Sequence, residues 1–418
     1  MHVVVAGQGY VGLPLAVRAA EVGHRVIGYD VDRHRVKQLA TGESYVEDVA
    51  SARLRAVLDS GAYSASSEAG APAGFDIAVI TVPTPLRDGA PDLACVETCA
   101  STLGAHLRPG ATVVLESTTY PGTTEELLLP ILEKASGLIA GADFHVGFSP
   151  ERIDPGNKKW PFDKTPKVVA GIDAASLDVI KGFYDGLVQT TVPVSSTKVA
   201  ELTKLIENIF RHVNIALVNE IAMLAKSLGV NIWEAIDAAA SKPFGYMRFT
   251  PGPGVGGHCL PIDPLFLSWK VERAVGVPFR FVELANDVNR HMPDYVIRRL
   301  IEAFNTRHKT VNGSRVLLLG LAYKPNTSDA RESPSTRIAE LLLDLGAEVR
   351  GADPHVVGDI HADARLIQVE ATVQEIAAAD AVVLLTDHAG FDYEAVLEHA
   401  PYVLDCRNRL PGANVDVL

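Results

Sequence analysis

The sequence is poor in cysteine and contains no long run of apolar residues. Its 418 residues include four cysteines, too few for a disulfide framework, so we expect a reducing compartment. No apolar run approaches the roughly 18 residues that cross a bilayer. An apolar segment follows Met1 directly and leaves no room for a secretory signal. We therefore expect a cytoplasmic protein that does not use a membrane as a partner.

The sequence is also short of basic residues. It has 38 Lys and Arg against 51 Asp and Glu, which gives a formal net charge of −13. This balance argues against nucleic acid as a main partner, although it leaves room for a local basic pocket. With 47% apolar and 21% charged residues, the composition is that of a globular protein with a large core, and the length predicts two or three domains.

Two of the cysteines, Cys95 and Cys99, are four residues apart and are expected to share one face of a helix. A structural zinc ion needs four ligands, and no second cysteine or histidine pair lies nearby in the sequence. We therefore expect both thiols to pack in the core, and we predict no metal site.

The first half of the chain alternates short β-branched runs with amphipathic stretches, which predicts a parallel, doubly wound sheet. The predicted strands are His2–Ala6, Arg25–Tyr29, Ile77–Val82, Thr112–Leu115, His145–Phe148 and Lys167–Ala170. The predicted helices are Leu13–Val22, Asp32–Ala40, Leu93–Leu107 and Thr123–Ala135.

The second half begins with helices and ends with another sheet. A long helix is predicted from about Ser195 to Leu228, and a second helical block from Leu265 to Arg307. The elements predicted after it are Arg315–Leu319, Pro334–Leu345, Glu348–Gly351, Ala381–Leu385 and Tyr402–Leu404. We therefore predict an α/β fold in which two Rossmann-like, doubly wound domains (residues 1–195 and 309–418) are joined by a central helical region (residues 196–308).

A dinucleotide fingerprint follows the first predicted strand. Gly7, Gly9 and Gly12 have the G-x-G-x-x-G spacing, which permits a tight turn and brings backbone N–H groups towards a pyrophosphate. The second strand ends at Asp30, which can bind an adenosine ribose and repel a 2′-phosphate. This arrangement favours NAD over NADP, although the nearby Arg35 could also face a 2′-phosphate.

The loop at residues 252–264 carries a thiol among glycines and prolines. Cys259 is followed four residues later by Asp263. Glycines let a backbone approach a ligand closely, so this presentation fits covalent chemistry on a carbonyl group. A buried, unreactive cysteine beside a tight turn fits the same spacing equally well.

A polar stripe is predicted on the long helix. Lys204 and Asn208, like the flanking Glu201 and His212, fall at helical spacing on one face. A solvated surface stripe is the usual explanation for such a pattern. Alternatively, an ammonium and a carboxamide four residues apart can donate hydrogen bonds to one oxyanion.

Together, these motifs resemble the UDP-glucose/GDP-mannose dehydrogenase family, and the resemblance runs nearly from end to end. The matching segments are Gly7–Gly12, Thr81–Pro85, Glu116–Thr118, Phe148–Arg152, Glu201–Asn208, Gly256–Asp263, Lys324–Ser333 and Asp405–Asn408. The resemblance implies an N-terminal NAD domain, a central dimerisation region, a C-terminal domain that holds UDP, and a homodimer or higher homo-oligomer. It also implies a four-electron oxidation of the sugar C6 alcohol to a uronate.

The resemblance further implies a role for individual residues. Cys259 would form a thiohemiacetal and then a thioester, Lys204 and Asn208 would stabilise oxyanions, and Asp263, Thr118 and Glu151 would handle protons and water. Residues implied to contact NAD are Gly7, Gly9, Tyr10, Val11, Gly12, Asp30, Arg35, Thr84, Thr118 and Arg331. Residues implied to contact the UDP-sugar are Glu151, Arg152, Lys204, Asn208, Arg248, Phe249, Gly256 and Lys324.

One segment departs from the UDP-glucose branch of the family. That branch typically carries a second glutamate four residues after the position of Glu151, where this sequence has Pro155. The segment is more similar to enzymes that act on UDP-N-acetylhexosamines, so we predict UDP-N-acetylglucosamine as the substrate. UDP-N-acetylmannosamine, UDP-N-acetylgalactosamine and UDP-glucose are the alternatives.

Two interpretations outside this chemistry are also compatible with an NAD-binding chain. A two-electron dehydrogenase of the hydroxyacid type would share the plan of a Rossmann domain and helices without needing a thiol. A non-catalytic NAD-binding protein would use Cys259 as a redox sensor. The joint presence of Lys204, Asn208, Cys259 and Asp263 disfavours both.

Overall fold

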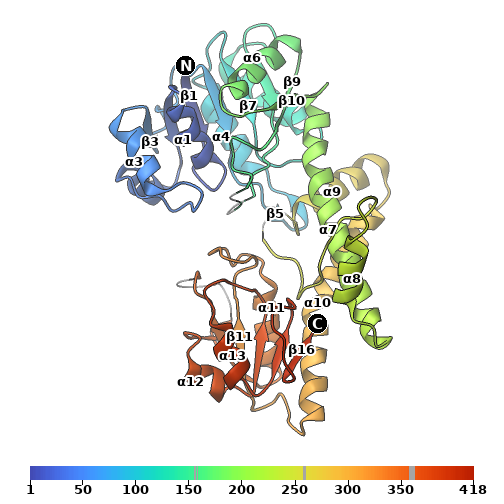
Figure 1. Cartoon of the computed structure of the whole chain (residues 1–418). Helices are drawn as coiled ribbons and strands as arrows, with labels where there is room; N and C mark the ends of the chain where they lie inside the picture. The colour runs from blue at the N-terminus through green and yellow to red at the C-terminus, as the bar shows by residue number, and fades with distance from the viewer. Residues whose placement is uncertain (155–156, 158, 258–259, 357–362) are drawn as a thin grey trace. The chain divides into compact units, whose positions relative to one another are not determined.

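The computed structural model describes residues 1–154, 157, 159–257, 260–356 and 363–418. By their contacts these residues form two compact units. The first consists of Met1–Glu207 with Leu265–Gly276, and the second of Asn208–Pro264 with Val277–Leu418 (Figure 1).

The first unit is built on an eight-stranded sheet in the order β10-β9-β8-β7-β4-β1-β2-β3. Its neighbouring strands are parallel except at β8 and β9, which are antiparallel. The strands are β1 (His2–Ala6), β2 (Arg25–Tyr29), β3 (Tyr63–Ser66), β4 (Ile77–Ile80), β7 (Thr112–Leu115), β8 (His145–Phe148), β9 (Lys167–Gly171) and β10 (Thr191–Pro193). A small antiparallel pair lies outside this sheet and is formed by β5 (Leu86–Arg87) and β6 (Ala90–Pro91).

Helices cover both faces of this sheet. One buried core includes side chains of α1 and α6, and the other includes side chains of α4 and α5. The helices of the unit are α1 (Gly12–Glu21), α2 (Arg33–Ala40), α3 (Ser51–Asp59), α4 (Ala94–Gly104), the π-helix η1 (Thr124–Leu128), α5 (Leu129–Ser136) and α6 (Ala174–Asp185). Strands with apolar side chains on both faces explain why β1, β4 and β7 are almost continuously apolar in sequence.

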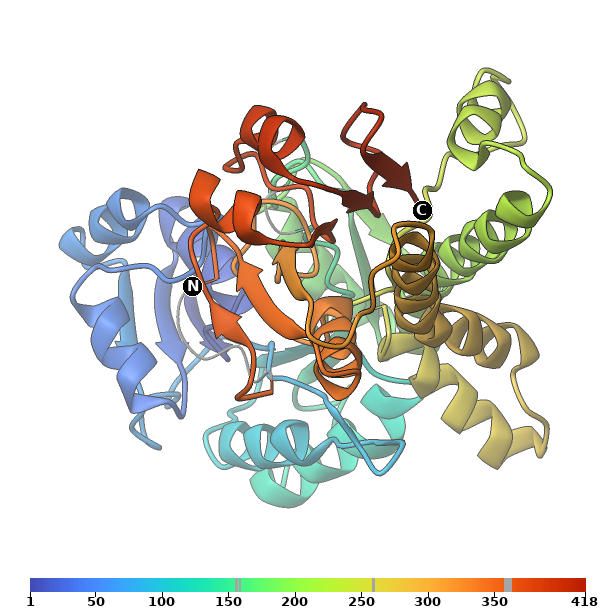
Figure 2. The same ribbon diagram turned by 90° about the horizontal axis from the view of Figure 1, so that it is seen from below.

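The second unit contains a fully parallel six-stranded sheet in the order β13-β12-β11-β14-β15-β16. Its strands are β11 (Arg315–Leu319), β12 (Glu348–Ala352), β13 (Ile367–Gln368), β14 (Ala381–Leu384), β15 (Val403–Asp405) and β16 (Val415–Val417). Side chains of α10 and α11 bury one face of this sheet, and those of α12 and α13 bury the other. The ribbon in Figure 2 shows these helices on the two sides of the sheet. These helices are α10 (Arg280–Thr306), α11 (Pro334–Asp344), α12 (Val373–Ala378) and α13 (Tyr393–His399).

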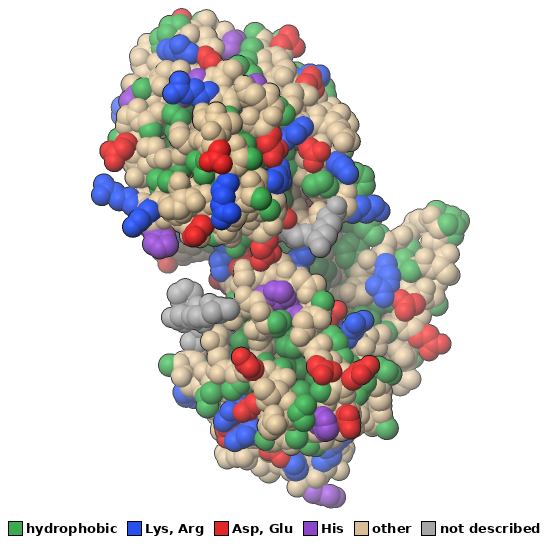
Figure 3. Space-filling view, turned by 60° about the vertical axis from the view of Figure 1, so that its left-hand side comes forward, with side chains coloured by type: hydrophobic (Ala, Val, Ile, Leu, Met, Phe, Trp, Pro, Cys, Tyr) green, Lys and Arg blue, Asp and Glu red, His purple; other side chains and the backbone are tan. Residues whose placement is uncertain are grey.

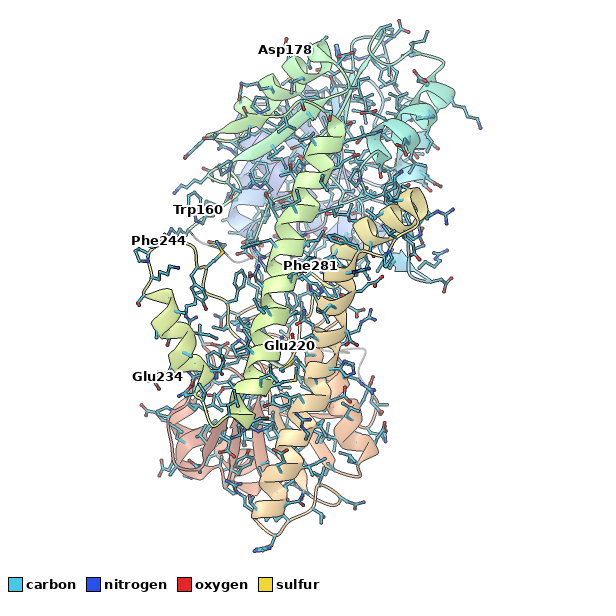
Figure 4. The ribbon with its side chains drawn as sticks, turned by 90° about the vertical axis from the view of Figure 1, so that its right-hand side faces the viewer. Trp160, Asp178, Glu220, Glu234, Phe244 and Phe281 are labelled. Carbon is cyan, nitrogen blue, oxygen red and sulfur yellow. The ribbon has the colours of Figure 1, made fainter. Side chains whose placement is uncertain are left out.

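Three further helices belong to the central part of the sequence. They are α7 (Thr197–Ser227), α8 (Ile232–Ala240) and α9 (Asp263–Val275). From Asn208 onwards, α7 lies beside α10 in the second unit (Figure 4). The helical block predicted from Leu265 to Arg307 is divided into two helices, because Gly276 adopts a positive φ of 73° and Pro278 follows two residues later.

Every strand and helix predicted from the sequence is present, and most of their ends differ by a few residues. The exceptions are the divided block from Leu265 to Arg307 and the helix predicted over Thr123–Ala135, which begins as the π-helix η1. The fold prediction of two doubly wound sheets is confirmed. The sequence interpretation missed β3, β5, β6, β10, β13 and β16, and it also missed α3, α6, α8, α12 and α13. The missed strands have two to four residues, too short for an alternating pattern to stand out.

Candidate active site

The glycine-rich turn after β1 has the geometry of a pyrophosphate cradle. Gly7 has a φ of 94°, and a Cβ on it would lie 2.7 Å from the Thr81 carbonyl oxygen. A Cβ on Gly12 would lie 1.8 Å from the Gly7 carbonyl oxygen, so only glycine fits either position. Gly9 instead faces open space, with no atom within 4 Å of its added Cβ. Gly7 and Gly12 therefore make the turn, and Gly9 leaves room for a ligand.

The helix that follows this turn offers donors to an anion. Val11 precedes the first residue of α1, and no side chain caps the N-terminus of this helix. The first N–H groups of a helix have no partner within it, and the helix dipole favours a negative charge there. Tyr10 and Val11 are half-buried beside the turn. The residues present therefore fit a dinucleotide phosphate.

Asp30 lies at the end of β2, where a ribose would be recognised. One carboxylate oxygen accepts from the Gln8 backbone N–H at 2.8 Å, and the other accepts from the Asp32 backbone N–H at 2.9 Å. Arg35 lies 3.9 Å from the first oxygen and stacks over the Tyr45 ring. Arg35 therefore lies against the Asp30 carboxylate. This arrangement fits an adenosine ribose with free hydroxyls, as in NAD.

Thr84 and Thr118 follow β4 and β7, two neighbouring parallel strands. The Thr84 hydroxyl donates to the Thr118 carbonyl oxygen at 2.8 Å, which ties the two strand ends together. Thr84 is buried and Thr118 is half-buried. Ligands of open α/β sheets bind at the carboxyl ends of the strands, where both threonines lie.

Glu151 and Lys204 meet within the first unit. The Lys204 ammonium donates to the Glu151 carbonyl oxygen at 2.5 Å, and both side chains are buried. The Oε2 atom of Glu151 is buried without a hydrogen-bond partner among the described residues. Arg152 points to other groups, because it pairs with Glu207 at 2.7 Å and donates to the Pro166 carbonyl oxygen at 2.7 Å. Pro155, on which the substrate prediction depends, lies outside the described residues.

A buried ionic network supports the segment that carries Glu151. Lys167, the first residue of β9, lies 2.9 Å from the Glu116 carboxylate and 3.9 Å from the Glu151 carboxylate. It also donates to the Pro150 carbonyl oxygen at 3.3 Å. Tyr184 of α6 donates to the other oxygen of Glu116. Burial raises the pKa of Glu116, and the Lys167 ammonium opposes this rise. One ammonium therefore faces two carboxylates in the protein interior.

The polar stripe predicted on the long helix is buried. Glu201, Lys204, Asn208 and His212 are all less than one tenth exposed. The sequence pattern left open a solvated surface stripe, and the structure excludes it. Glu201 accepts hydrogen bonds from the backbone N–H groups of Gly122 and Thr124, at 2.5 and 2.8 Å. The buried polar face of α7 thus has specific partners.

In the second unit, Asn208 and Asp263 meet. The Asn208 amide donates to the Asp263 carboxylate at 2.6 Å, and both side chains are buried. Asp263 is the first residue of α9, where a carboxylate is favoured by the helix dipole. Cys259, predicted as the nucleophile, lies outside the described residues, as does His258.

The glycines before Cys259 are packed tightly. A Cβ on Gly256 would lie 2.7 Å from both the Glu332 carbonyl oxygen and the Tyr323 side chain. The Gly257 N–H donates to the Arg331 carbonyl oxygen at 3.1 Å. The loop backbone therefore runs directly against residues 323–332, which contain two of the predicted ligand-contacting residues. Close backbone approach explains the glycines here.

Those two residues, Lys324 and Arg331, lie on the long loop after β11. Lys324 is half-buried, and Arg331 is exposed and forms two bonds with the Asp329 carboxylate, at 2.8 and 2.6 Å. Arg248, predicted to contact the sugar, is exposed and paired with Asp237 at 2.8 Å.

Phe249, also predicted to contact the sugar, is half-buried. Its ring packs edge-on against Phe210 at a centroid distance of 5.8 Å. The structure therefore places this side chain among apolar neighbours.

Two of the other cysteines are poorly suited to act as nucleophiles. Cys99 and Cys406 are buried, and burial raises the pKa of each thiol to about 12. Cys95 is exposed, which corrects the prediction that both thiols of α4 pack in the core. Within the described residues, no group of three or more His, Cys, Asp or Glu side chains could hold a metal ion. No helix in the described part of the chain has the length and apolar character needed to span a bilayer.

Several buried polar groups were not predicted from the sequence. Lys167 and Tyr184 are examples, as are Asp353 and His388, which lie 2.9 Å apart in the second unit. A lysine at the start of an otherwise apolar strand was a signal for the first pair. His388 carried no such signal, because its partner lies 35 residues away.

The sequence matches the UDP-glucose/GDP-mannose dehydrogenase family in three consecutive segments. Residues 1–188 match its NAD binding domain, residues 198–291 its central domain and residues 317–411 its UDP binding domain. The chain is 35% identical over 392 residues to the UDP-N-acetyl-D-mannosamine dehydrogenase of Pyrococcus horikoshii, covering 94% of this chain and 90% of that protein.

Two further similarities extend this result. The chain is 36% identical over 360 residues to the UDP-N-acetyl-D-glucosamine 6-dehydrogenase of Pseudomonas aeruginosa, covering 85% of this chain and 83% of that protein. A solved structure of the UDP-D-ManNAc dehydrogenase from Pyrococcus horikoshii matches with a TM-score of 0.91 at 33% identity. That match covers 100% of this chain and 98% of the other.

Proposed function

Because the chain belongs to the UDP-glucose/GDP-mannose dehydrogenase family, we propose that it oxidises the C6 alcohol of UDP-N-acetylglucosamine to the carboxylate. The chain is an NAD-dependent oxidoreductase, and the family and cofactor predictions are confirmed. The proposal concerns the substrate, the four-electron outcome and the residues that act. The observation that carries it is the burial of Lys204 and Asn208 on the polar face of α7.

The buried ammonium and carboxamide suit an oxyanion. Attack of a Cys259 thiolate on a C6 aldehyde forms a carbon–sulfur bond and moves the carbonyl electron pair onto oxygen. Lys204 and Asn208 donate hydrogen bonds to that oxygen, and their burial strengthens these bonds because water does not screen them. NAD, held at the glycine turn and Asp30, would supply the hydride acceptor for both oxidations. Loss of a hydride from the thiohemiacetal carbon, with the oxygen electron pair re-forming the carbonyl bond, leaves Cys259 as a thioester.

The carboxylates serve hydrolysis of the thioester that results. Water adds to the thioester carbon, the carbon–sulfur bond breaks, and the thiol leaves with the proton that water loses. Glu151 supports this role because its buried Oε2 has no hydrogen-bond partner among the described residues and can accept a proton from water. Asp263 and Thr118 orient the water, and Asp263 in turn is oriented by Asn208.

In this proposal the nucleotide sugar is held by the residues that the family motifs indicate. Gly256, Lys324 and Phe249 contact the UDP-sugar, together with Arg152 and Arg248. For the two arginines, the observed carboxylate pairs must rearrange, because each guanidinium now faces a glutamate or an aspartate. Arg331 reaches NAD.

UDP-N-acetylmannosamine is the second candidate substrate. The observation that favours it is the similarity to the Pyrococcus horikoshii enzyme, which is named for that sugar and covers more of the chain than the Pseudomonas aeruginosa relative. The two sugars differ only in the configuration at C2, so the chemistry at C6 is the same for both.

A second copy of the chain is the proposed partner. Phe210, Leu217, Ile221, Leu224 and Leu228 are each more than two fifths exposed. The first four, separated by seven, four and three residues, form one stripe along α7, and Leu228 directly follows the last residue of this helix. Exposed apolar stripes of this kind mark interaction surfaces, and a helix of this length can pair with its own copy in an isologous dimer.

The test of the proposed function is the number of NADH molecules formed per sugar consumed. UDP-N-acetylglucosamine, UDP-N-acetylmannosamine, UDP-N-acetylgalactosamine, UDP-glucose and GDP-mannose are compared in parallel. We expect two NADH per sugar and the highest kcat/KM with UDP-N-acetylglucosamine. Two NADH per sugar and the highest kcat/KM with another sugar would make that sugar the substrate. One NADH per sugar would contradict the covalent role of Cys259.

Two variants separate the two oxidations. Cys259→Ala removes the nucleophile, so we expect no uronate, whereas Cys259→Ser retains an oxygen nucleophile and is expected to accumulate an ester-linked enzyme visible by intact mass spectrometry. The matched control is Cys95→Ala, which removes an exposed thiol of α4. Uronate formed by Cys259→Ala at the wild-type rate would contradict the mechanism.

A further inference from the structure

A chain of buried hydrogen bonds connects α7 and α10 with the glycine loop. The Gly252 N–H donates to the Asn219 side-chain oxygen at 2.9 Å, and the Asn219 amide donates to the Asn289 side-chain oxygen at 2.9 Å. The Asn289 amide nitrogen lies 3.4 Å from His212 Nδ1 and donates to the His212 carbonyl oxygen, also at 3.4 Å. His212 Nε2 lies 2.8 Å from the Asn286 side-chain oxygen. All five residues are buried.

In this series of hydrogen bonds, the Gly252 N–H fixes which atom of every later pair is the donor. A backbone N–H can only donate, so the Gly252 amide requires the oxygen of Asn219 and leaves the Asn219 NH₂ group for Asn289. The NH₂ group of Asn289 then faces His212, whose Nδ1 must accept. The His212 proton is therefore on Nε2, where it bonds to the Asn286 oxygen. The imidazole is neutral in this arrangement.

The surroundings of His212 favour that neutral form. Burial lowers the pKa of His212, the bond to Asn286 opposes this, and the charge of Arg290 on α10 lowers the pKa further. One turn earlier on α7 lies Asn208, which is bonded to the Asp263 carboxylate. The apolar neighbours of this stretch include Ala216, Ala285 and Val288.

The series of hydrogen bonds ends at Gly252, on the loop that leads to Cys259. Gly252 is buried, and its N–H has Asn219 as acceptor. Five residues later, Gly257 is fixed by the Arg331 carbonyl oxygen. The segment between them is thus held at both ends. Paired polar groups inside a protein give a unique arrangement, because a group left without its partner loses roughly 1 to 3 kcal/mol.

We propose that His212, acting through Asn289 and Asn219, is a positioning residue that fixes the backbone at Gly252, and that it does so only while its imidazole is neutral. Protonation of Nδ1 places a second donor against the Asn289 NH₂ group. This repulsion outweighs the bond from the Asn289 amide to the His212 carbonyl oxygen, so the amide turns over. The Asn219 amide turns over in response, and the Gly252 N–H loses its acceptor. The proposal rests on the proposed function only in that this loop carries the nucleophile.

The first test is independent of turnover. Hydrogen exchange of the Gly252 amide is compared between wild type, His212→Leu and His212→Gln, with His291→Gln on the exposed side of α10 as the matched control. A leucine cannot hydrogen-bond, whereas a glutamine can accept and donate as the neutral imidazole does. We expect exchange about tenfold faster in His212→Leu, because one buried hydrogen bond is lost, and near-wild-type exchange in the two glutamine variants. Unaltered exchange in His212→Leu would overturn the proposal.

The second test is the pH profile of kcat on the acid side. Glutamine does not titrate, so in His212→Gln we expect the fall in kcat towards low pH to move to lower pH, and turnover at neutral pH to be largely restored relative to His212→Leu. The His291→Gln profile should match wild type. An acid limb that stays in place in His212→Gln would contradict the proposal. Failure of the proposed function would instead appear as an altered NADH ratio in the wild-type enzyme.

Discussion

Single residues at equivalent points of the two sheets have different partners. Asp30 and Asp353 each follow the second strand of a doubly wound sheet, and each accepts a hydrogen bond from the turn after the first strand. Asp353 accepts in addition from Ala322, His355 and Val356 backbone N–H groups and lies against His388. Its side chain is fully enclosed, so it supports the loop and is not available to a ribose.

The ionised state of Asp353 has a consequence for stability. Burial raises its pKa, but the bonds from His388 and from the Ala322 and His355 backbone outweigh this and lower the pKa from 3.8 to about 2. A carboxylate with a lowered pKa stabilises the fold above pH 3.8, and this stability is lost as the pH falls towards 2. The shift corresponds to about 2 kcal/mol at neutral pH.

Asp353→Asn is therefore expected to lose about 2 kcal/mol near neutral pH, and the difference from wild type should shrink as the pH falls from 3.8 to 2. The measurement is the urea unfolding midpoint along a pH series. Asp178→Asn, at the exposed surface of α6, is the control and should follow wild type throughout (Figure 4). A difference that did not change with pH would show that the effect is one of packing and not of charge.

At the scale of elements, the two faces of α7 have the opposite exposure to those of an ordinary surface helix. Its polar residues Glu201, Lys204, Asn208 and His212 are buried, whereas an apolar stripe faces outwards. Helical spacing shows that two faces exist, but not which one is covered. The buried face has partners on several segments, including the π-helix η1, which Glu201 contacts, and α10, which His212 contacts. These contacts explain why polar side chains are tolerated inside.

Strand β9 is joined to the segment that follows β7 by the pair of Lys167 and Glu116, and Tyr184 of α6 also binds this glutamate. Removing one member of a buried ion pair leaves the other charge without compensation, which costs about 3 to 5 kcal/mol. We expect Lys167→Met to lose stability in this range, measured by chemical unfolding with far-UV circular dichroism. The control Lys181→Met breaks the exposed pair with Asp185 and should cost less than about 0.5 kcal/mol. Equal losses in the two variants would contradict this assignment.

At the scale of the whole molecule, the surface charge is mixed and the apolar stripe of α7 stands out from it. Figure 3 shows basic and acidic side chains interspersed on the faces that it draws, in keeping with a net charge of −13 spread over 418 residues. The stripe of Phe210, Leu217, Ile221, Leu224 and Leu228 is the basis of the proposed dimer. The predicted domain boundaries after residues 195 and 308 stay predictions, because α7 runs without interruption from the first compact unit into the second.

Leu217→Glu should break the proposed dimer. A glutamate in the middle of the stripe would have to be buried without a partner, so we expect light scattering to give the mass of a monomer, 44.7 kDa, where wild type gives twice that mass. Val373→Glu on α12 is the matched control, since it replaces another exposed apolar residue of the second unit. If the Leu217→Glu protein had the same mass as wild type, this face would not be the dimer interface.

The sequence by itself determined the two doubly wound sheets, the NAD fingerprint and the family. These depend on local patterns, such as apolar runs between helices and glycines at Gly7, Gly9 and Gly12, whose spacing along the chain is itself the signal. The roles of Cys259 and Asp263 were also predicted from motifs and stay predictions, because the first lies outside the described residues.

Only the tertiary structure decided which side chains are buried and which residues they pair with. Cys95 and Cys99 are four residues apart, yet one is exposed and the other buried. Lys167 meets Glu116 across 51 positions of sequence, and Asn289 meets His212 across 77. Burial depends on what the rest of the chain places over a face. Periodicity along one segment does not show which other segments pack over its faces. The partners of these buried polar groups are therefore set only when distant elements pack together.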